Sequence, residues 1–113
     1  MSGEDRIDLV TRLIERYNAQ DADGYAAFFT DSGSEASYRG PVVREGKEGV
    51  REGLRKMFAE FPENRAEILE SYALGEHVVL SERVWRSRAT EPFDVMTVYS
   101  FSGDKVDRVE FIR

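Results

Sequence analysis

The stretch HVVLSERVWRSRATEPFDVMTVYSF (77–101) decides the expected fold. Two runs rich in β-branched and aromatic residues flank Thr90-Glu91-Pro92, a sequence typical of a turn. We therefore predict two long strands, over 77–89 and 93–101. The rest of the chain is expected to cover their sheet or to add strands to it.

Helical spacing dominates the first half of the chain. A stripe with spacings of three and four predicts a helix over 5–20, formed by Ile7, Val10, Leu13, Ile14 and Tyr17. Asp21 is a plausible N-cap for a second helix over 22–30, and Pro62 ends a third helix over 46–61. Short extended segments are predicted over 35–39 and 42–45.

The second half of the chain has the pattern of strands. Two further strands are predicted, over 64–74 before the hairpin and over 105–112 after it. Helices segregated from an antiparallel meander indicate an α+β fold. At 113 residues, we expect a single domain covering 1–113.

Composition excludes several classes of function. The net charge of −6, without a block of Lys or Arg, argues against binding to nucleic acid or to an anionic membrane. No apolar run reaches the ~20 residues of a membrane span, and no signal peptide begins the chain, so a cytoplasmic protein is expected. With no cysteine and one histidine, His77, we expect no metal and no cofactor.

Both faces of the predicted sheet carry apolar residues, but three helices can cover only one of them. Side chains alternate across a strand, so one face gathers a set that would be exposed in a monomer. We predict a homodimer through this set, which comprises Val78, Leu80, Val84, Met96, Val98 and Ile112. Strong curvature of the sheet is the alternative means of hiding it.

Four segments resemble the nuclear transport factor 2-like superfamily, in its SnoaL-like and ketosteroid-isomerase-like branch. They are YNAQDADGYAAFFTD (17–31), GKEGV (46–50), VVLSERV (78–84) and GDKV (103–106). The resemblance covers nearly the whole chain, which it marks as a SnoaL-like domain. It implies a cone in which a strongly curved, mostly antiparallel sheet wraps three N-terminal helices and encloses an apolar pocket for a small ligand.

The resemblance also implies which residues line that pocket. The lining is expected on the face of the hairpin that carries Arg83 and Tyr99, and on the helices and other strands that border the pocket. The expected residues are Leu13, Tyr17, Ser37, Phe58, Ser81, Arg83, Trp85, Val95, Thr97, Tyr99, Val109 and Phe111.

The catalytic residues known in the superfamily are not retained. Ser37 stands where a ketosteroid-isomerase-like base would be, Leu13 where its tyrosine would be, and Thr97 where its second acid would be. Of a limonene-epoxide-hydrolase-like set, Arg83 matches the arginine, whereas Trp85 and Phe111 replace the two aspartates.

Tyr17 and Arg83 are the remaining catalytic candidates. Tyr17 lies one turn beyond Leu13 and offers a hydroxyl, although a tyrosine on a helix stripe is often core. A buried Arg83 would anchor a ligand oxygen or pair with a carboxylate such as Glu35 or Glu110.

Three functions follow from this pattern. The first is a small-molecule-binding domain with an apolar pocket. The second is an isomerase, cyclase or hydratase acting on a small apolar carbonyl compound. The third is a non-catalytic dimerisation module whose cavity is filled by side chains.

Overall fold

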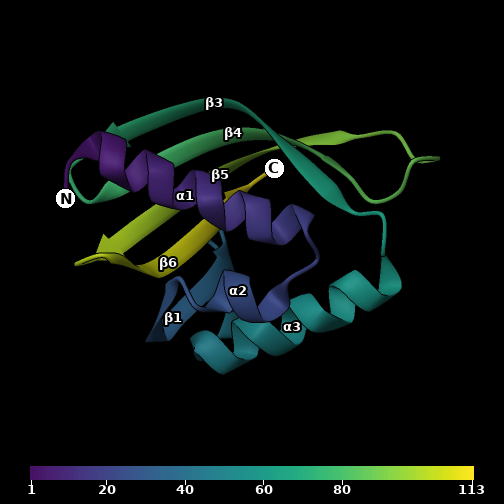
Figure 1. Cartoon of the computed structure of the whole chain (residues 1–113), viewed down its shortest axis with the longest axis horizontal. Coiled ribbons are helices and arrows are strands. Elements are labelled where there is room, and N and C mark those ends of the chain that lie inside the picture. The colour runs from purple at the N-terminus through teal and green to yellow at the C-terminus, as the bar shows by residue number, and fades with distance from the viewer.

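Three helices and six strands form the protein, and the computed structural model describes all 113 residues. The elements are α1 (Gly3–Asn18), α2 (Ala22–Ala26), β1 (Phe29–Ser37), β2 (Val42–Glu45), α3 (Gly46–Glu60), β3 (Arg65–Leu74), β4 (His77–Trp85), β5 (Phe93–Ser102) and β6 (Lys105–Ile112). One sheet joins all strands in the order β2-β1-β6-β5-β4-β3. Figure 1 shows the long strands β3 and β4 arching over α1, with α2 and α3 beside the opposite end of the sheet. The α+β fold predicted from the sequence is confirmed.

Local sequence fixes where the helices begin and end. Ser2 and Asp5 form a reciprocal capping box at the start of α1, and Asp21 caps α2 by accepting from the amide of Gly24. Helix α3 ends at Glu60, and Pro62 follows its C-cap Phe61, close to where the sequence predicts the end of the helix. The buried stripe of α1, which is Leu9, Val10, Leu13 and Ile14, packs into the core.

Tight turns and bulges shape the sheet. Gly75 and Gly103 have φ values of 56° and 62° in the β3–β4 and β5–β6 turns, a region of backbone space that glycine enters without strain. The register shifts between Ile68 and Glu70 in β3 and between Glu35 and Ala36 in β1. Such bulges bend the strands that carry them, so the sheet curves around α1.

Three predicted boundaries were wrong by at least four residues. The second helix ends at Ala26 instead of continuing to residue 30, and β1 begins at Phe29 rather than at Glu35. Phe29 belongs to β1 and is buried in the core, whereas the sequence analysis places it in the second helix. Strand β4 ends at Trp85, and residues 86–92 form the connection to β5.

The predicted faces of β4 were inverted. Val78, Leu80 and Val84 point into the core, with at most 6% of their surface exposed, and so they form no dimer face. The pairing of Leu80 with Thr97 and of Val84 with Phe93 explains this result, because even-numbered residues of β4 share a face with odd-numbered residues of β5. Met96 and Val98 do lie on the outer face, as predicted.

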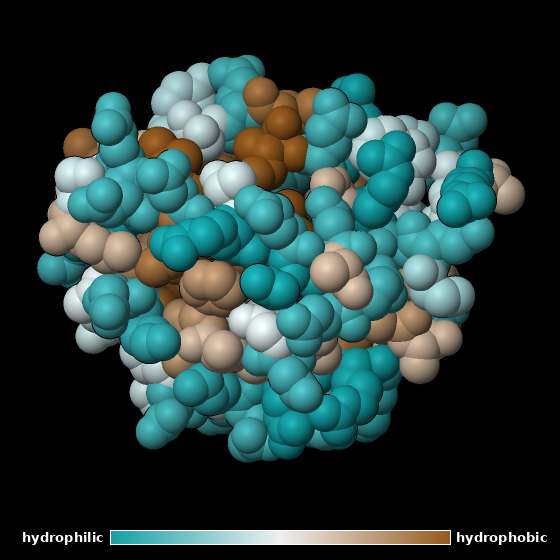
Figure 2. Space-filling model, in the orientation of Figure 1, coloured by the Kyte–Doolittle hydropathy of each residue, from teal (hydrophilic) through white to brown (hydrophobic).

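The helix surfaces are strongly polar. Figure 2 shows a largely hydrophilic face on which hydrophobic residues gather only in smaller groups. No helix is long and apolar enough to cross a membrane.

Candidate functional site

Two neighbouring chambers that share lining residues open between the helices and the concave side of the sheet. The outer chamber has a volume of about 530 Å³ and lies between α3, β1, β2 and the end of β6. The inner chamber, of about 60 Å³, lies against β4 and β5. Both are lined by Tyr17, Tyr25, Arg86, Phe111 and Arg113, so these residues surround the junction. The outer volume is typical of small-molecule sites.

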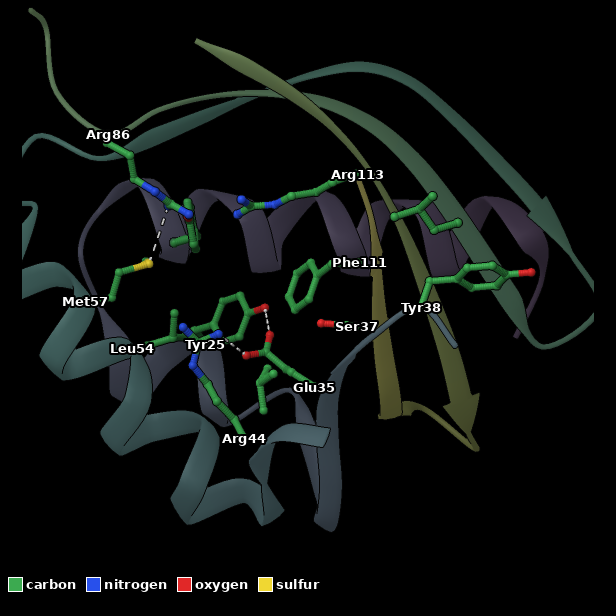
Figure 3. Close-up of a pocket in the computed structure, with 13 residues that line it drawn as sticks. Tyr25, Glu35, Ser37, Tyr38, Arg44, Leu54, Met57, Arg86, Phe111 and Arg113 are labelled. Atoms are coloured by element: carbon green, nitrogen blue, oxygen red, sulfur yellow. Dashed lines mark hydrogen bonds and ion pairs between the residues drawn. The ribbon is translucent and has the colours of Figure 1, made fainter. Parts of the chain in front are cut away.

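A buried ion pair closes one side of the outer chamber. Glu35 is fully buried on β1, and its Oε1 accepts a 2.6 Å hydrogen bond from Nη1 of Arg44 on β2. Its Oε2 accepts another, also 2.6 Å long, from the hydroxyl of Tyr25 (Figure 3). Burial and the charge of Glu35 hold the pKa of Tyr25 well above its usual value, so Tyr25 stays a donor. Both oxygens of Glu35 are therefore occupied by protein groups.

Glu82 is a second buried carboxyl group, on β4 in the wall of the inner chamber. It is 5% exposed, and its single protein partner is the hydroxyl of Thr97, which donates to Oε2 over 2.5 Å. Burial raises its pKa to about 7, against the lowering effect of Thr97 and with a contribution from the charge of Glu35. No guanidinium is among the groups that shift it. Glu82 can therefore both accept and donate a proton near neutral pH.

A short hydrogen-bond chain holds Tyr17 at the junction. Arg86 Nη1 donates to Asn64 Oδ1 over 2.7 Å, and Asn64 Nδ2 donates to the Tyr17 hydroxyl over 2.7 Å. Because Arg86 can only donate, the orientation of the Asn64 amide is fixed by this chain. Burial raises the pKa of Tyr17 despite the lowering effects of Asn64 and Arg86. The protonated hydroxyl, already an acceptor from Asn64, is left with its own proton to donate.

Tyr99 adds a further hydroxyl to the inner chamber. It is 1% exposed and makes no side-chain hydrogen bond to the protein. Burial and the nearby charges of Glu82 and Glu35 raise its pKa well above the usual value. Its hydroxyl is therefore available to hydrogen-bond a ligand oxygen in the inner chamber.

Half of the residues predicted to line the pocket lie in its walls. These are Tyr17, Ser37, Val95, Thr97, Tyr99 and Phe111. Leu13 and Val109 are fully buried in the core, and Phe58 packs edge-on against the Tyr17 ring at a centroid distance of 5.5 Å. Ile112, predicted for the dimer face, lies at the rim of the outer chamber.

The other three predicted lining residues face away from the cavity. Ser81, Arg83 and Trp85 lie on the convex side of β4, because their neighbours Leu80, Glu82 and Val84 point inward. Arg83 forms a two-pronged contact with Asp94, at 2.9 and 3.3 Å, on the opposite strand. Arg65 stacks on Trp85 at 4.0 Å. The prediction that Arg83 and Trp85 belong to the ligand site was therefore wrong.

Sequence analysis missed Glu82, Arg86 and Asn64. A signal for Glu82 was present, since Val78, Leu80 and Val84 form an unbroken aliphatic face whose parity includes residue 82. The match of Arg83 to a family arginine favoured the opposite parity instead. No local pattern marks Asn64 or Arg86, because α1, the α3–β3 connection and the β4–β5 connection come together only in the folded chain.

Acidic and histidine side chains do not gather into a metal-like cluster. No group of three or more His, Cys, Asp or Glu residues is arranged to hold a metal ion. His77 lies at the exposed start of β4, where its Nδ1 is 3.0 Å from the Ser100 hydroxyl.

Solved structures share this architecture. An uncharacterised cystatin-fold protein from Novosphingobium aromaticivorans is 50% identical, with a TM-score of 0.91, over 96% of this chain and 97% of that one. A candidate SnoaL-like polyketide cyclase from Jannaschia sp. CCS1 is 15% identical, with a TM-score of 0.78, over 97% and 85%. A hypothetical protein with a ketosteroid-isomerase-like fold from Catenulispora acidiphila DSM 44928, in complex with trimethylamine, is 16% identical, with a TM-score of 0.77, over 93% and 84%. No curated protein sequence matches the chain.

A curved sheet that wraps around helices and leaves a cavity lined partly by polar groups is the architecture of nuclear transport factor 2-like α+β proteins. Within that class, the sequence profile of the SnoaL-like domain matches residues 10–109. The chain belongs to the SnoaL-like domain family, which confirms the resemblance noted in the sequence.

Proposed function

We propose that this protein catalyses proton transfer at a carbon next to the carbonyl group of a small apolar compound, as an isomerase or cyclase does. Glu82 is the proton carrier in this proposal. The observation that carries it is a buried carboxyl group with a pKa of about 7, facing an open cavity and held by one hydrogen bond. An acid–base group works best when its pKa lies near the working pH.

The proton moves in two steps. Ionised Glu82 takes a proton from the carbon, and the electron pair moves onto the carbonyl oxygen to form an enolate. Tyr17, which accepts from Asn64 and keeps its own proton to donate, is placed to stabilise that oxygen. Protonated Glu82 then returns the proton to another carbon. In ring closure, the enolate instead attacks a second carbonyl carbon, and protonated Glu82 gives its proton to the alkoxide oxygen that forms.

The two chambers suit a ligand with a reactive end and an apolar body. The inner chamber has room for only a few atoms, which fits a carbonyl group and the carbon beside it. Leu54, Met57 and Phe111 give the outer chamber its apolar surface. Neither chamber is filled by side chains, which argues against a purely structural module.

The test is deuterium exchange at the acidic carbon of 2-tetralone, followed by proton NMR in D₂O. We expect catalysed exchange whose rate rises with pH through about 7, as Glu82 ionises. Glu82→Gln should lower the rate about 100-fold or more. Glu67→Gln is the matched control, because Glu67 is exposed and pairs in register with Arg83. Exchange that survives Glu82→Gln would refute the proposal.

A binding domain without turnover is the second candidate. The volume of the outer chamber supports this candidate. So does Glu35, because both of its carboxylate oxygens are hydrogen-bonded to protein groups and are not free to act on a ligand. Saturable binding of 2-tetralone with no catalysed exchange at any pH between 5 and 9 would select this candidate.

A further inference from the structure

The cavity carries an excess of positive charge although the chain is acidic. Its charged lining residues are Arg44, Arg86, Arg113, Glu35 and Glu82. Arg44 is neutralised by Glu35 at 2.6 Å. Arg86 and Arg113 form no ion pair, in a chain with 22 acidic and 16 basic residues. Two guanidinium charges therefore remain at the junction of the chambers.

Both guanidinium groups lie against one aromatic ring. The guanidinium carbon of Arg86 is 5.0 Å from the centroid of the Phe93 ring, and that of Arg113 is 4.4 Å from it. Figure 3 shows the two side chains extending toward one another, Arg113 from just beyond β6 and Arg86 from just beyond β4. The ring attracts each cation, but the two like charges repel each other. An anion bound to both would remove that repulsion.

Unused donors are available for such an anion. The hydrogen bonds of Arg86 to Asn64 and Tyr17 both come from Nη1, which leaves Nε and Nη2 without protein partners. The Arg113 side chain makes no hydrogen bond to the protein. A planar guanidinium offers paired N–H groups whose spacing matches the two oxygens of a carboxylate. The Asn64 contact holds Arg86 in place before any ligand arrives.

We propose that the ligand of this cavity is a small apolar carboxylic acid that also carries the carbonyl group of the proposed reaction, and that its carboxylate is bound by Arg86 and Arg113 at the junction of the two chambers. The inference rests on the proposed function, because it names the substrate class of the same cavity. The apolar body of the acid occupies the outer chamber beside Leu54 and Met57. Its reactive carbon enters the inner chamber beside Glu82.

The test compares trans-cinnamate with the neutral cinnamamide by isothermal titration calorimetry at pH 7. The two probes share shape and differ in charge. We expect cinnamate to bind about tenfold or more tightly than cinnamamide, and its affinity to fall as salt rises. Arg86→Met and Arg113→Gln should each weaken cinnamate about tenfold and weaken cinnamamide much less, because only cinnamate loses a charge-assisted contact. Arg113→Gln covers the case in which Arg86→Met does not fold, since Arg113 is exposed.

Arg83→Met is the matched control, because Arg83 lies on the convex face of β4, three residues before Arg86, and pairs with Asp94. It should bind cinnamate as the wild type does. Equal affinities for cinnamate and cinnamamide would overturn the carboxylate inference, while catalysed exchange of 2-tetralone would leave the proposed function standing. Binding of cinnamate that is unaffected by both arginine variants would also overturn it. Exchange lost in Glu82→Gln with cinnamate still bound would support both proposals.

Discussion

Glu82 combines a cost to folding with a titration range that suits acid–base chemistry. Its carboxyl group is buried with a single hydrogen bond and no cation beside it. Ionising a group in such surroundings is unfavourable, which is why its proton is held up to about pH 7. The same property places its titration in the range where an acid–base group works.

Replacing Glu82 by Gln should stabilise the fold at alkaline pH. The folded protein holds the proton more tightly than the unfolded chain, so wild-type stability falls as pH rises from about 4.5 to about 7. Each pKa unit corresponds to about 1.4 kcal/mol, so the loss is on the order of 3 kcal/mol at pH 8. Thermal melts of Glu82→Gln should exceed the wild type at pH 8 and match it near pH 4.5. A difference that is independent of pH would contradict this account.

Tyr17→Phe separates the donor role of the hydroxyl from its packing. The substitution keeps the ring against Phe58 but removes the acceptor of Asn64 Nδ2. We expect a loss of about 1–2 kcal/mol in unfolding free energy and a slower 2-tetralone exchange, by about tenfold. Tyr72→Phe, on the exposed face of β3, is the control for both measurements. A Tyr17→Phe variant with full activity would remove Tyr17 from the mechanism.

At the scale of elements, helix α3 holds the Glu35–Arg44 pair in place from outside. A Cβ atom added at Gly53 would come within 2.5 Å of Arg44 Nε and 2.6 Å of its Cδ. The Arg44 side chain cannot swing away freely, because its guanidinium is bound to Glu35. The absence of a side chain at this position of α3 therefore makes room for the ion pair.

Two glycine-to-alanine variants of α3 should have opposite effects. Gly49→Ala meets only ordinary contact, with Arg44 carbonyl carbon at 3.7 Å, so it should stabilise the helix by about 0.5–1 kcal/mol. Gly53→Ala should lower stability, because it displaces Arg44 from Glu35. Urea unfolding of both variants measures the difference. Equal stabilisation by both would show that Arg44 moves aside without cost.

The hairpin of β4 and β5 shows what sequence can establish about an element and what it cannot. Both strands were predicted from 77–101, and β5 was assigned its correct faces. The error was in β4, which ends at Trp85 and leaves seven residues, 86–92, in the connection. A shift of one residue in pairing moves every side chain to the other face, so an unknown connection leaves the parity of β4 open.

At the scale of the whole molecule, the convex face of the sheet is the surface that the helices leave uncovered. Its apolar members are Tyr72, Leu74, Val79, Trp85, Met96 and Val98, and the most exposed of them are Leu74 at 84%, Tyr72 at 60% and Met96 at 44%. An apolar surface of this kind is typical of an interface. We propose that the homodimer uses these residues in place of Val78, Leu80 and Val84.

Size-exclusion chromatography with light scattering tests the dimer. The wild type should have the mass of two chains at micromolar concentration, and Met96→Lys should have the mass of one. Thr90→Lys, in the β4–β5 connection, should remain a dimer, since it lies outside the strands. A monomeric wild type at high micromolar concentration would refute this proposal.

The sequence by itself determined the elements, the α+β class and the family, because apolar spacing, caps and turn residues act over a few positions along the chain. Tertiary structure alone decided which side of β4 faces the helices, since that depends on pairing across the connection to β5. As a result, Glu82 lies in the cavity wall and Arg83 lies on the opposite face of the sheet. It also brought Asn64, Arg86 and Tyr17 together from distant segments, through hydrogen bonds that no local pattern encodes.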